Sequence, residues 1–277
     1  MGQIKITNLP VLPSVMASIL ALDDNNEMNF RELERIIQTD QAMTTLVLKA
    51  ANSSFYSRSG SIRTIQHAIA MLGFKMVRSL TILSSGKALF GSGNYARFRK
   101  HVWQHSIVTA MYSRTIAEKS GHKEIMEEAF VAGLLHDIGK AVLNMNNRAL
   151  YIQVFDSVER ENLNFAEAEK KLLGITHHEA GKMAIDTWNI PGVFAVIASE
   201  HDDDNVSNGN PLLNIVKYAN YLACAAGFGH TSERDPAFPD EMQKELKLTQ
   251  ADEDYYCGEY AEQLENDEFY KFASALV

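Results

Sequence analysis

Apolar side chains recur at helical spacing along almost the whole chain of 277 residues, and this pattern constrains the fold most strongly. Segment 30–37 places its large apolar residues on one helical face. Segment 42–51 repeats the pattern behind Asp40, a residue expected to cap its first turn. Sustained alternation of apolar and polar residues, which is typical of strands, is missing. The sequence therefore predicts an all-α protein.

Interruptions of the pattern indicate how these helices are grouped. The small and polar residues Gly91 to Asn94 form the best interior boundary. Beyond it, helices are expected at about 97–119, 124–135, 147–161, 164–173, 177–188, 191–201 and 211–227. The predicted organisation is an N-terminal helical lobe over 1–92, a bundle over 93–230 and a C-terminal helical extension over 231–277 that docks on the bundle.

Composition excludes several classes of protein. Hydrophobic residues make up 46% of the chain and charged residues 22%, as in ordinary globular proteins. A net charge of −9 argues against a nucleic-acid partner and against an anionic membrane surface. Two isolated cysteines, Cys224 and Cys257, support neither a disulfide framework nor a cysteine-based zinc site. No segment approaches the roughly 20 apolar residues of a membrane span, and the N-terminus has no signal-peptide layout, so the cytoplasm is the expected compartment.

The octet from Gly133 to Lys140, with the sequence GLLHDIGK, contains three residues that could bind a metal or a substrate. His136 and Asp137 offer an imidazole nitrogen and a carboxylate, which are ligands for divalent ions. On a continuous helix Lys140 would lie on the same side as this pair and could hold a substrate phosphate beside the metal. The alternative is a buried hydrogen bond between His136 and Asp137, with Lys140 as the counter-charge.

Three further histidines fall in separate predicted helices, namely His105, His178 and His201. Metal sites in helical bundles are built in this way, from single ligands that project inward from facing helices. A lone histidine of this kind is more often a hydrogen-bonded core residue, but three of them joining one His-Asp pair favour a site. The set predicts a centre for a divalent metal of the iron, manganese or zinc class.

The order of these motifs resembles the HD superfamily of metal-dependent phosphohydrolases, and more narrowly its HDOD branch, the HD-related output domain of bacterial signalling proteins. The N-terminal motifs that carry the narrower resemblance are Leu9 to Pro13, Ile36 to Asp40, Leu48 to Ser53 and Ile65 to Gly73. The HD-like half adds Trp103 to Ser106, His136 to Lys140, His178 to Gly181, Trp188 to Pro191 and Glu200-His201. The resemblance implies an HD-like helical bundle with an additional N-terminal helical lobe.

The resemblance also implies a ligand set, which this chain keeps only in part. HDOD domains have typically lost some HD ligands and are regarded as regulatory, whereas this chain retains His105, His136, Asp137, His178 and His201. The last ligand of catalytic HD domains is an aspartate, and the matching residue here is Asn220, which offers a neutral oxygen. Glu200 is the candidate for a compensating carboxylate. Restoring the charge with Asn220→Asp is expected to raise metal occupancy.

Two functions remain open. The first, which we favour because of Asn220, is a cytoplasmic regulatory module of bacterial signal transduction that binds a signalling protein partner without turnover. The second is a metal-dependent phosphohydrolase acting on a nucleotide or another phosphate ester, with Asp137 and Lys140 as catalytic groups. A phosphate-containing small molecule is an expected ligand, while nucleic acid and membrane are not expected partners.

Overall fold

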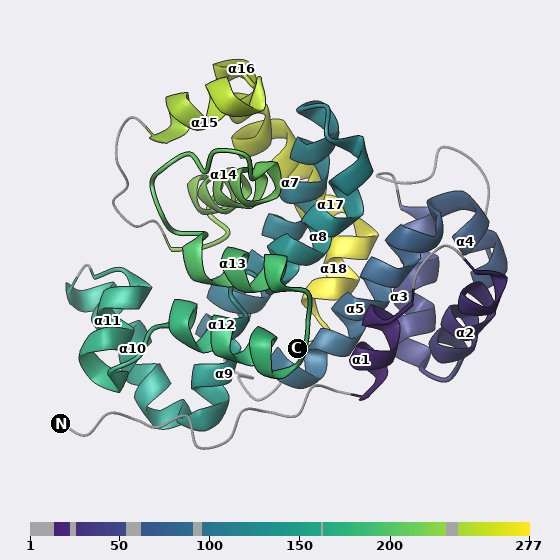
Figure 1. Ribbon diagram of the computed structural model, residues 1–277, viewed down its shortest axis with the longest axis horizontal. Helices are drawn as coiled ribbons and strands as arrows, with labels where there is room; N and C mark the ends of the chain where they lie inside the picture. Colours follow the sequence, from purple (N-terminus) through teal and green to yellow (C-terminus); the bar gives the residue numbers. More distant parts are fainter. Residues whose placement is uncertain (1–13, 23–25, 54–61, 91–95, 162, 231–237) are drawn as a thin grey trace. The chain divides into compact units, whose positions relative to one another are not determined.

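The computed structural model describes residues 14–22, 26–53, 62–90, 96–161, 163–230 and 238–277. All regular structure in these residues is helical and none of it is strand, which confirms the predicted all-α class (Figure 1). The boundary proposed at Gly91 to Asn94, the motif Leu9 to Pro13 and the start of the proposed C-terminal extension lie outside the described residues.

The described chain divides into two compact units. Unit 1 contains Leu89–Glu259, and unit 2 contains residues 14–88 together with Tyr260–Val277. The segment expected to form one C-terminal extension is therefore shared, with its first part in unit 1 and its last part in unit 2. The division into three domains remains a prediction.

Unit 2 is built from short helices around an apolar core. Its helices are α1 (Ser14–Leu20), α2 (Glu27–Gln38), α3 (Gln41–Asn52), α4 (Ile65–Leu72), most of α5 (Phe74–Phe90), α17 (Ala261–Asn266) and α18 (Glu268–Ser274). The expected cap at Asp40 is confirmed, because its Oδ1 atom accepts hydrogen bonds from the first-turn amides of α3. Helix α18 packs on α3, where Lys49 forms an ion pair with Glu268.

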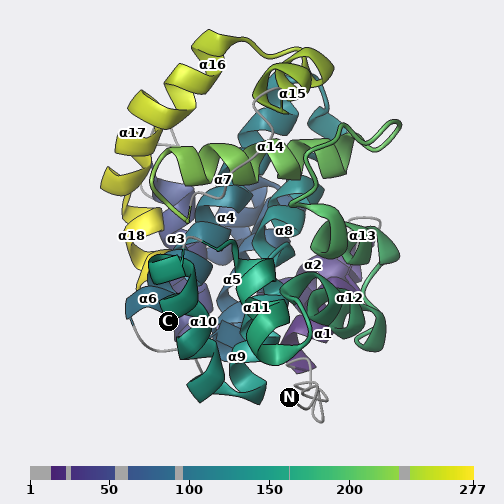
Figure 2. The same ribbon diagram turned by 90° about the vertical axis from the view of Figure 1, so that its left-hand side faces the viewer.

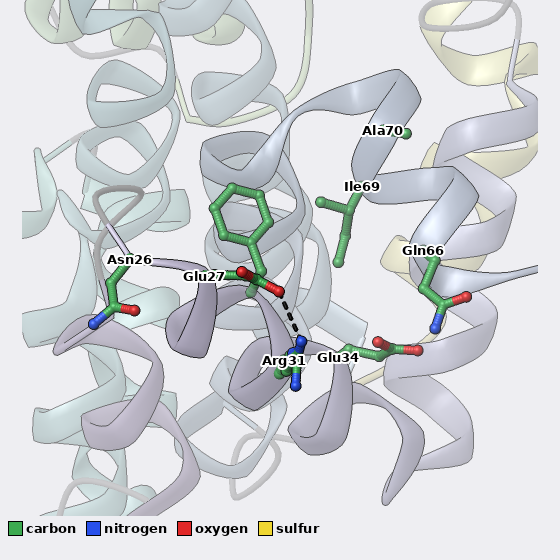
Figure 3. Close-up of a pocket in the computed structure, with 8 residues that line it drawn as sticks. Asn26, Glu27, Arg31, Glu34, Gln66, Ile69 and Ala70 are labelled. Carbon is green, nitrogen blue, oxygen red and sulfur yellow. Dashed lines mark hydrogen bonds and ion pairs between the residues drawn. The ribbon is translucent and has the colours of Figure 1, made fainter.

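A groove of about 540 Å³ lies between α2 and α4 of unit 2 (Figure 3). Phe30, Ile69 and Ala70 supply its apolar surface. Its rim is polar, and Arg31 on that rim is ion-paired with Glu27 at 2.7 Å. The groove combines an apolar floor with charged edges, which is the usual character of sites that receive an apolar side chain.

Unit 1 holds the helices that carry the predicted site. They are α6 (Ala96–Phe98), α7 (His105–Lys119), α8 (Met126–Leu135), α9 (Ile138–Asn146), α10 (Arg148–Glu161), α11 (Phe165–Leu173), α12 (His177–Thr187), α13 (Gly192–Glu200), α14 (Pro211–Ala225), α15 (Phe238–Leu246) and α16 (Gln250–Tyr255). A π-helical segment, Arg99–Gln104, joins α6 to α7 and ends directly before His105. Such π-helical turns recur at functional sites.

Two packing groups position the site helices within unit 1. Helix α7 packs closely on α8, and α14 crosses both (Figure 1). The close approach requires glycine at position 133, because a Cβ there would lie 2.7 Å from the Ser113 hydroxyl and 2.8 Å from the Ala110 backbone. The second group consists of α9 to α13, in which α12 contacts both α9 and α13 (Figure 2).

The end of unit 1 is fastened to α14 and α7 by buried polar contacts. Glu253 of α16 accepts hydrogen bonds from Tyr218, Tyr221 and Gln243 at 3.3, 3.0 and 2.6 Å. The Tyr112 hydroxyl donates to the backbone oxygen of Tyr256 at 2.8 Å. These contacts keep α15 and α16 on the bundle.

No single helix in the described part of the chain is long and apolar enough to cross a membrane. Helices α4 and α5 together meet the criteria of length and composition, but the chain bends by 118° between them, at Gly73.

Candidate metal centre

The pair His136-Asp137 lies in a break between two helices, and the expected end of a helix at residue 135 is confirmed. Helix α8 ends at Leu135, and α9 begins at Ile138, so His136 and Asp137 occupy the turn between them. The turn still brings Lys140 to Asp137, because the lysine lies in the first turn of α9. Its Nζ atom is 2.7 Å from Asp137 Oδ2. All three side chains are buried.

The imidazoles of His105 and His136 face each other through their Nε2 atoms. The Nδ1 atoms lie 2.7 Å from the backbone oxygens of Phe228 and Gly133, respectively. Because a carbonyl oxygen can only accept, each Nδ1 donates, and in the neutral rings each Nε2 carries a lone pair. The two Nε2 atoms are 3.2 Å apart. Two lone pairs at this distance repel, and a cation between them removes the repulsion.

A second set of ligand-type side chains begins with His177, the first residue of α12. A capping box formed by Thr176 and Glu179 starts this helix and fixes the direction of its first turn. Glu169 of α11 accepts from the His177 ring Nδ1 at 2.6 Å and from its backbone amide at 2.6 Å. The Tyr151 hydroxyl donates to the other Glu169 oxygen at 2.8 Å. Glu169 thereby aims the His177 Nε2 atom away from α11, as carboxylates behind metal-bound histidines do.

The His177 Nε2 atom points at a carboxylate that follows α13. Asp202 Oδ2 lies 3.4 Å from His177 Nε2, 3.1 Å from His178 Nε2 and 3.6 Å from His201 Nε2. His201 is oriented by its own Nδ1, which donates to the backbone oxygen of Ile197 at 3.1 Å. His177 and His201 are buried, whereas the side chains of His178 and Asp202 are 21% and 37% exposed. The accessible side of the site is therefore the side of Asp202 and His178.

Asp137 joins the two sets of side chains. Its Oδ2 atom lies 3.4 Å from His136 Nε2 and 3.7 Å from His105 Nε2. Its Oδ1 atom lies 3.4 Å from His201 Nε2 and 3.7 Å from His177 Nε2. One carboxylate thus faces both groups, and side chains from five helices or helix ends converge on it.

These distances meet a direct test for a metal ion. Two ligands roughly 2.1 Å from one ion and 90–110° apart are separated by about 3.0–3.4 Å. The separations between ligand atoms here, 3.1 to 3.7 Å, fall in or just above that range. Three buried atoms of the site also lack a hydrogen-bond partner, namely Asp137 Oδ1, His177 Nε2 and His201 Nε2. In folded proteins most buried polar atoms have a hydrogen-bond partner, so three such atoms gathered in one place fit an ion rather than a closed hydrogen-bond network.

The residues present form two adjacent groups that could each hold an ion: His105, His136 and Asp137 in group A, and His177, His178, His201 and Asp202 in group B. Both offer nitrogen and oxygen donors without a thiolate. Such a donor set suits zinc, iron and manganese. The residues therefore fit a divalent metal of the predicted class.

Glycine at position 139 allows the two groups to meet. A Cβ on Gly139 would lie 1.9 Å from the backbone oxygen of His177 and 2.7 Å from the backbone nitrogen of Gly181. Any larger residue would push α12 away from α9. The Gly139 of the octet therefore acts by permitting close backbone approach, which holds His177 next to Asp137.

Electrostatics divide the imidazoles into two kinds. Burial lowers the pKa of both His105 and His201 to about 3, so both are neutral, as metal ligands must be. Burial also opposes a charge on His177, but the Glu169 carboxylate outweighs it and raises the pKa of His177 to about 9. An ion that binds His177 must therefore displace a proton.

The two aspartates are held in the charged form. Burial raises the pKa of Asp137, but Lys140 and His136 outweigh this effect and lower the pKa well below its usual range. Burial likewise opposes the charge of Asp202, and His201 and the neighbouring imidazoles lower its pKa. Both carboxylates are thus available as anionic ligands.

The family profile of the HDOD domain matches residues 9–203 of this chain. The chain belongs to the HDOD domain family. An uncharacterized protein of Treponema pallidum (strain Nichols) is 22% identical over 219 residues, which make up 78% of this chain. The matching part is only 42% of that relative, so this HDOD chain spans less than half of its length.

Solved structures share the fold of this HDOD protein. An HDOD domain protein with unknown function from Geobacter sulfurreducens has a TM-score of 0.78 at 22% identity, with 98% of this chain and 94% of that chain covered. A Marinobacter aquaeolei VT8 protein, named for signal transduction, has a TM-score of 0.74 at 21% identity, with 97% and 59% covered. A Shewanella amazonensis SB2B protein, named as a metal-dependent phosphohydrolase, has a TM-score of 0.64 at 17% identity, with 97% and 92% covered. These identities support a likeness of fold alone.

Five of the residues selected from the sequence of this HDOD chain lie in the two groups, namely His105, His136, Asp137, His178 and His201. Two others belong to neither group. Glu200 is the last residue of α13, and Asn220 uses its amide to donate to Asp202 at 2.9 Å. Lys140 lies at the site, where it pairs with Asp137 and stacks 4.4 Å from the centre of the Phe165 ring.

Sequence reasoning missed His177, Asp202 and Glu169. His177 and Asp202 directly precede or follow the selected residues His178 and His201. Only the orientation of the helix decides which of two neighbouring side chains faces the site. Glu169 carried a clearer signal. It lies on the apolar face of α11, close in helical position to the buried Phe165, Ala168 and Leu173, where an acidic side chain is costly unless it has partners.

Proposed function

We propose that this protein is a regulatory HDOD module of bacterial signal transduction whose HD-type pocket binds a divalent metal and acts by binding rather than by turnover. The observation that carries the proposal is the convergence of Nε2 atoms on Asp137 and Asp202, with unsatisfied buried atoms on both sides. An ion bound there ties α7, α8 and α9 to α12 and α13. Metal loading would thus set the rigidity of unit 1, which is the property that a partner can sense.

Two features favour binding over turnover. Most of the ligand-type side chains are buried, and access is confined to the side of His178 and Asp202. Lys140, the group expected to stabilise a phosphate, is engaged by Asp137 at 2.7 Å. Burial opposes its charge, but Asp137 and other carboxylates raise the pKa of Lys140, so the pair stays ionic.

A phosphohydrolase is the second candidate, and one observation favours it. Asp137 of group A also faces His201 of group B, and pairs of adjacent ions are typical of enzymes that cleave phosphate esters. A bound metal would supply a hydroxide from water and polarise a phosphoryl oxygen. In this reading Asp137 and His177 hold the ions, and Lys140 turns from Asp137 towards the phosphate.

The expected ligands follow from the surfaces of the two units. A phosphate-bearing small molecule would be held by Lys140, which lies against the Phe165 ring, once this lysine turns from Asp137. A protein partner suits the groove between α2 and α4, whose apolar floor would receive one of its side chains (Figure 3).

The test is metal content combined with turnover. Protein purified without chelator or a metal column is analysed for iron, manganese and zinc, then titrated with Mn²⁺ and Zn²⁺ by calorimetry. We expect binding in the wild type, loss of binding in Asp137→Ala, and no change in the control Asp186→Ala, an exposed aspartate of α12. Hydrolysis of p-nitrophenyl phosphate and of cyclic dinucleotides is measured in parallel. Metal-dependent turnover that Asp137→Ala abolishes would replace the regulatory function by the enzymatic one, and a wild type without metal would defeat both.

A further inference from the structure

The loop that carries Asp202 is held by one face of α14. Asn214, Lys217 and Asn220 are spaced by three residues along this helix and contact the loop at successive points. We call these three residues the α14 polar stripe. Polar residues in such positions are unusual, because all three are buried.

Lys217 makes the central contact of the stripe. Its side chain is fully buried, and the Nζ atom donates to the backbone oxygen and Oδ1 of Asn205 at 2.9 and 2.8 Å and to Ser207 Oγ at 3.2 Å. A buried ammonium is costly unless its donors are satisfied. The lysine therefore selects the loop conformation that brings Asn205 and Ser207 to it.

The two asparagines fix the ends of the same loop. Asn214 accepts from the Ser207 amide at 2.8 Å and donates to the Ser207 backbone oxygen at 3.1 Å, so it pairs with the loop as a neighbouring strand would. Asn220 donates to Asp202 Oδ1 at 2.9 Å. The other oxygen of Asp202, Oδ2, is the one that faces the imidazoles of group B.

We propose that the α14 polar stripe positions Asp202 as the second carboxylate ligand of the metal centre, in place of the carboxylate that position 220 lacks. Asn220 is then a positioning residue and not a ligand. It occupies one carboxylate oxygen and leaves the other for the ion. This inference rests on the proposed metal binding and adds where the compensating charge comes from: residue 202 of the loop, rather than Glu200 or α14 itself.

The role of the α14 polar stripe is tested by substituting a residue that does not itself contact the ion and measuring the metal affinity. Lys217→Met keeps the length of the side chain and suits a buried position, but removes the donors that hold the loop. We expect the Mn²⁺ and Zn²⁺ affinities of the folded variant to fall about 10- to 100-fold, which is typical when the support of a ligand is lost. The control is Tyr218→Phe, which removes the hydroxyl contact of the next α14 residue with Glu253, a contact that does not involve the loop. It should leave the affinity unchanged.

A second variant guards against misfolding of the first. Asn205→Ala combined with Ser207→Ala removes two side-chain acceptors of Lys217 from the loop, where Asn205 is exposed, and leaves α14 intact. The affinity should again fall. The visible spectrum of the Co²⁺-loaded protein adds a readout that stability alone would not move, because loss of a carboxylate ligand changes the coordination number and the band intensities.

The outcomes separate this inference from the proposed function. If the wild type binds metal and Asp202→Ala weakens it, but both loop variants bind like the wild type with an unchanged Co²⁺ spectrum, the stripe has no positioning role. If Asp202→Ala leaves the affinity unchanged, the carboxylate is not a ligand and the inference is overturned while metal binding stands. A wild type that binds no metal overturns both.

Discussion

The Nε2 atom of His201 lies 3.4 Å from the Oδ1 atom of Asp137, and neither atom has a hydrogen-bond partner although both are buried. His201 Nδ1 donates to the backbone of Ile197, so the neutral ring presents a lone pair to a carboxylate oxygen. Acceptor facing acceptor is unfavourable in the absence of a cation. An ion bound between these two atoms should therefore stabilise the folded protein.

The first prediction concerns stability. Saturating Mn²⁺ or Zn²⁺ should raise the free energy of unfolding, by about 2.7 kcal/mol when the free metal is 100 times its dissociation constant. The measurement is chemical unfolding followed by circular dichroism, with EDTA-treated protein as the reference. Asp137→Ala serves as the control and should show no response to metal. Equal unfolding midpoints with and without metal in the wild type would contradict the prediction.

The second prediction concerns Glu169. Glu169→Gln removes the charge behind His177, which should weaken metal binding about 10- to 100-fold at pH values above 9, where proton competition is absent. The matched control is Glu128→Gln, an exposed glutamate of α8. Calorimetric titration of both variants gives the comparison. An affinity of Glu169→Gln equal to that of the control would mean that His177 does not ligate the ion.

The third prediction concerns pH. The raised pKa of His177, about 9, means that the metal-free site holds a proton at neutral pH that the ion must displace. Metal affinity should therefore rise about tenfold per pH unit between pH 7 and 9 and level off above. Proton release is measured by calorimetry in buffers of different ionisation enthalpy. In Glu169→Gln the dependence should flatten, because the pKa of His177 falls towards its usual value; a pH-independent affinity of the wild type would exclude this coupling.

The sequence predicts many helices of this protein well because helices such as α2 and α3 bury one stripe of side chains. The capping group at Asp40 is local, so the sequence around it is enough to reveal it. The end of α8 at Leu135 agrees with the helix expected over 124–135, whereas α9, Ile138–Asn146, was not among the expected helices. The position of α9 depends on the close approach of α12 to Gly139, a tertiary contact that spacing does not reveal.

The sequence predicted which types of residue form the site, but not which individual residues belong to it. Periodicity shows that residues 177 and 178 both lie on a helix, yet only the packing of α11 selects His177, through the Glu169 carboxylate. Asp202 lies beyond the end of α13, in a loop whose path depends on the buried Lys217. A lysine on an apolar helix face is visible in the sequence, but its acceptors are not.

The fourth prediction concerns Lys140. Lys140→Ala leaves the Asp137 carboxylate buried beside imidazoles without its cation, so the metal-free protein should lose about 3–5 kcal/mol of stability. Bound metal replaces the missing charge, and the loss should be smaller in the loaded protein. Unfolding in urea with and without metal measures both values, and the exposed Lys182→Ala is the control. A loss below about 1 kcal/mol in the metal-free form would show that Lys140 is not the counter-charge. Titration with inorganic phosphate then reports whether it binds an anion instead.

The last prediction reverses an expectation from the sequence. From the sequence alone, Asn220→Asp should raise metal occupancy, because it restores the aspartate of catalytic relatives. In the structure the Asn220 amide donates to Asp202 Oδ1 at 2.9 Å, and an aspartate would replace this donor by a second negative charge beside the first. Asp202 should then turn away from group B, and the affinities for Mn²⁺ and Zn²⁺ should fall.

Asn220→Ala separates loss of the donor from gain of the charge. If repulsion is the cause, Asn220→Asp binds metal more weakly than Asn220→Ala at the same pH. An Asn220→Asp variant that binds either metal more tightly than the wild type would make position 220 a ligand site. In that case the loop that carries Asp202 would support the fold rather than the ion.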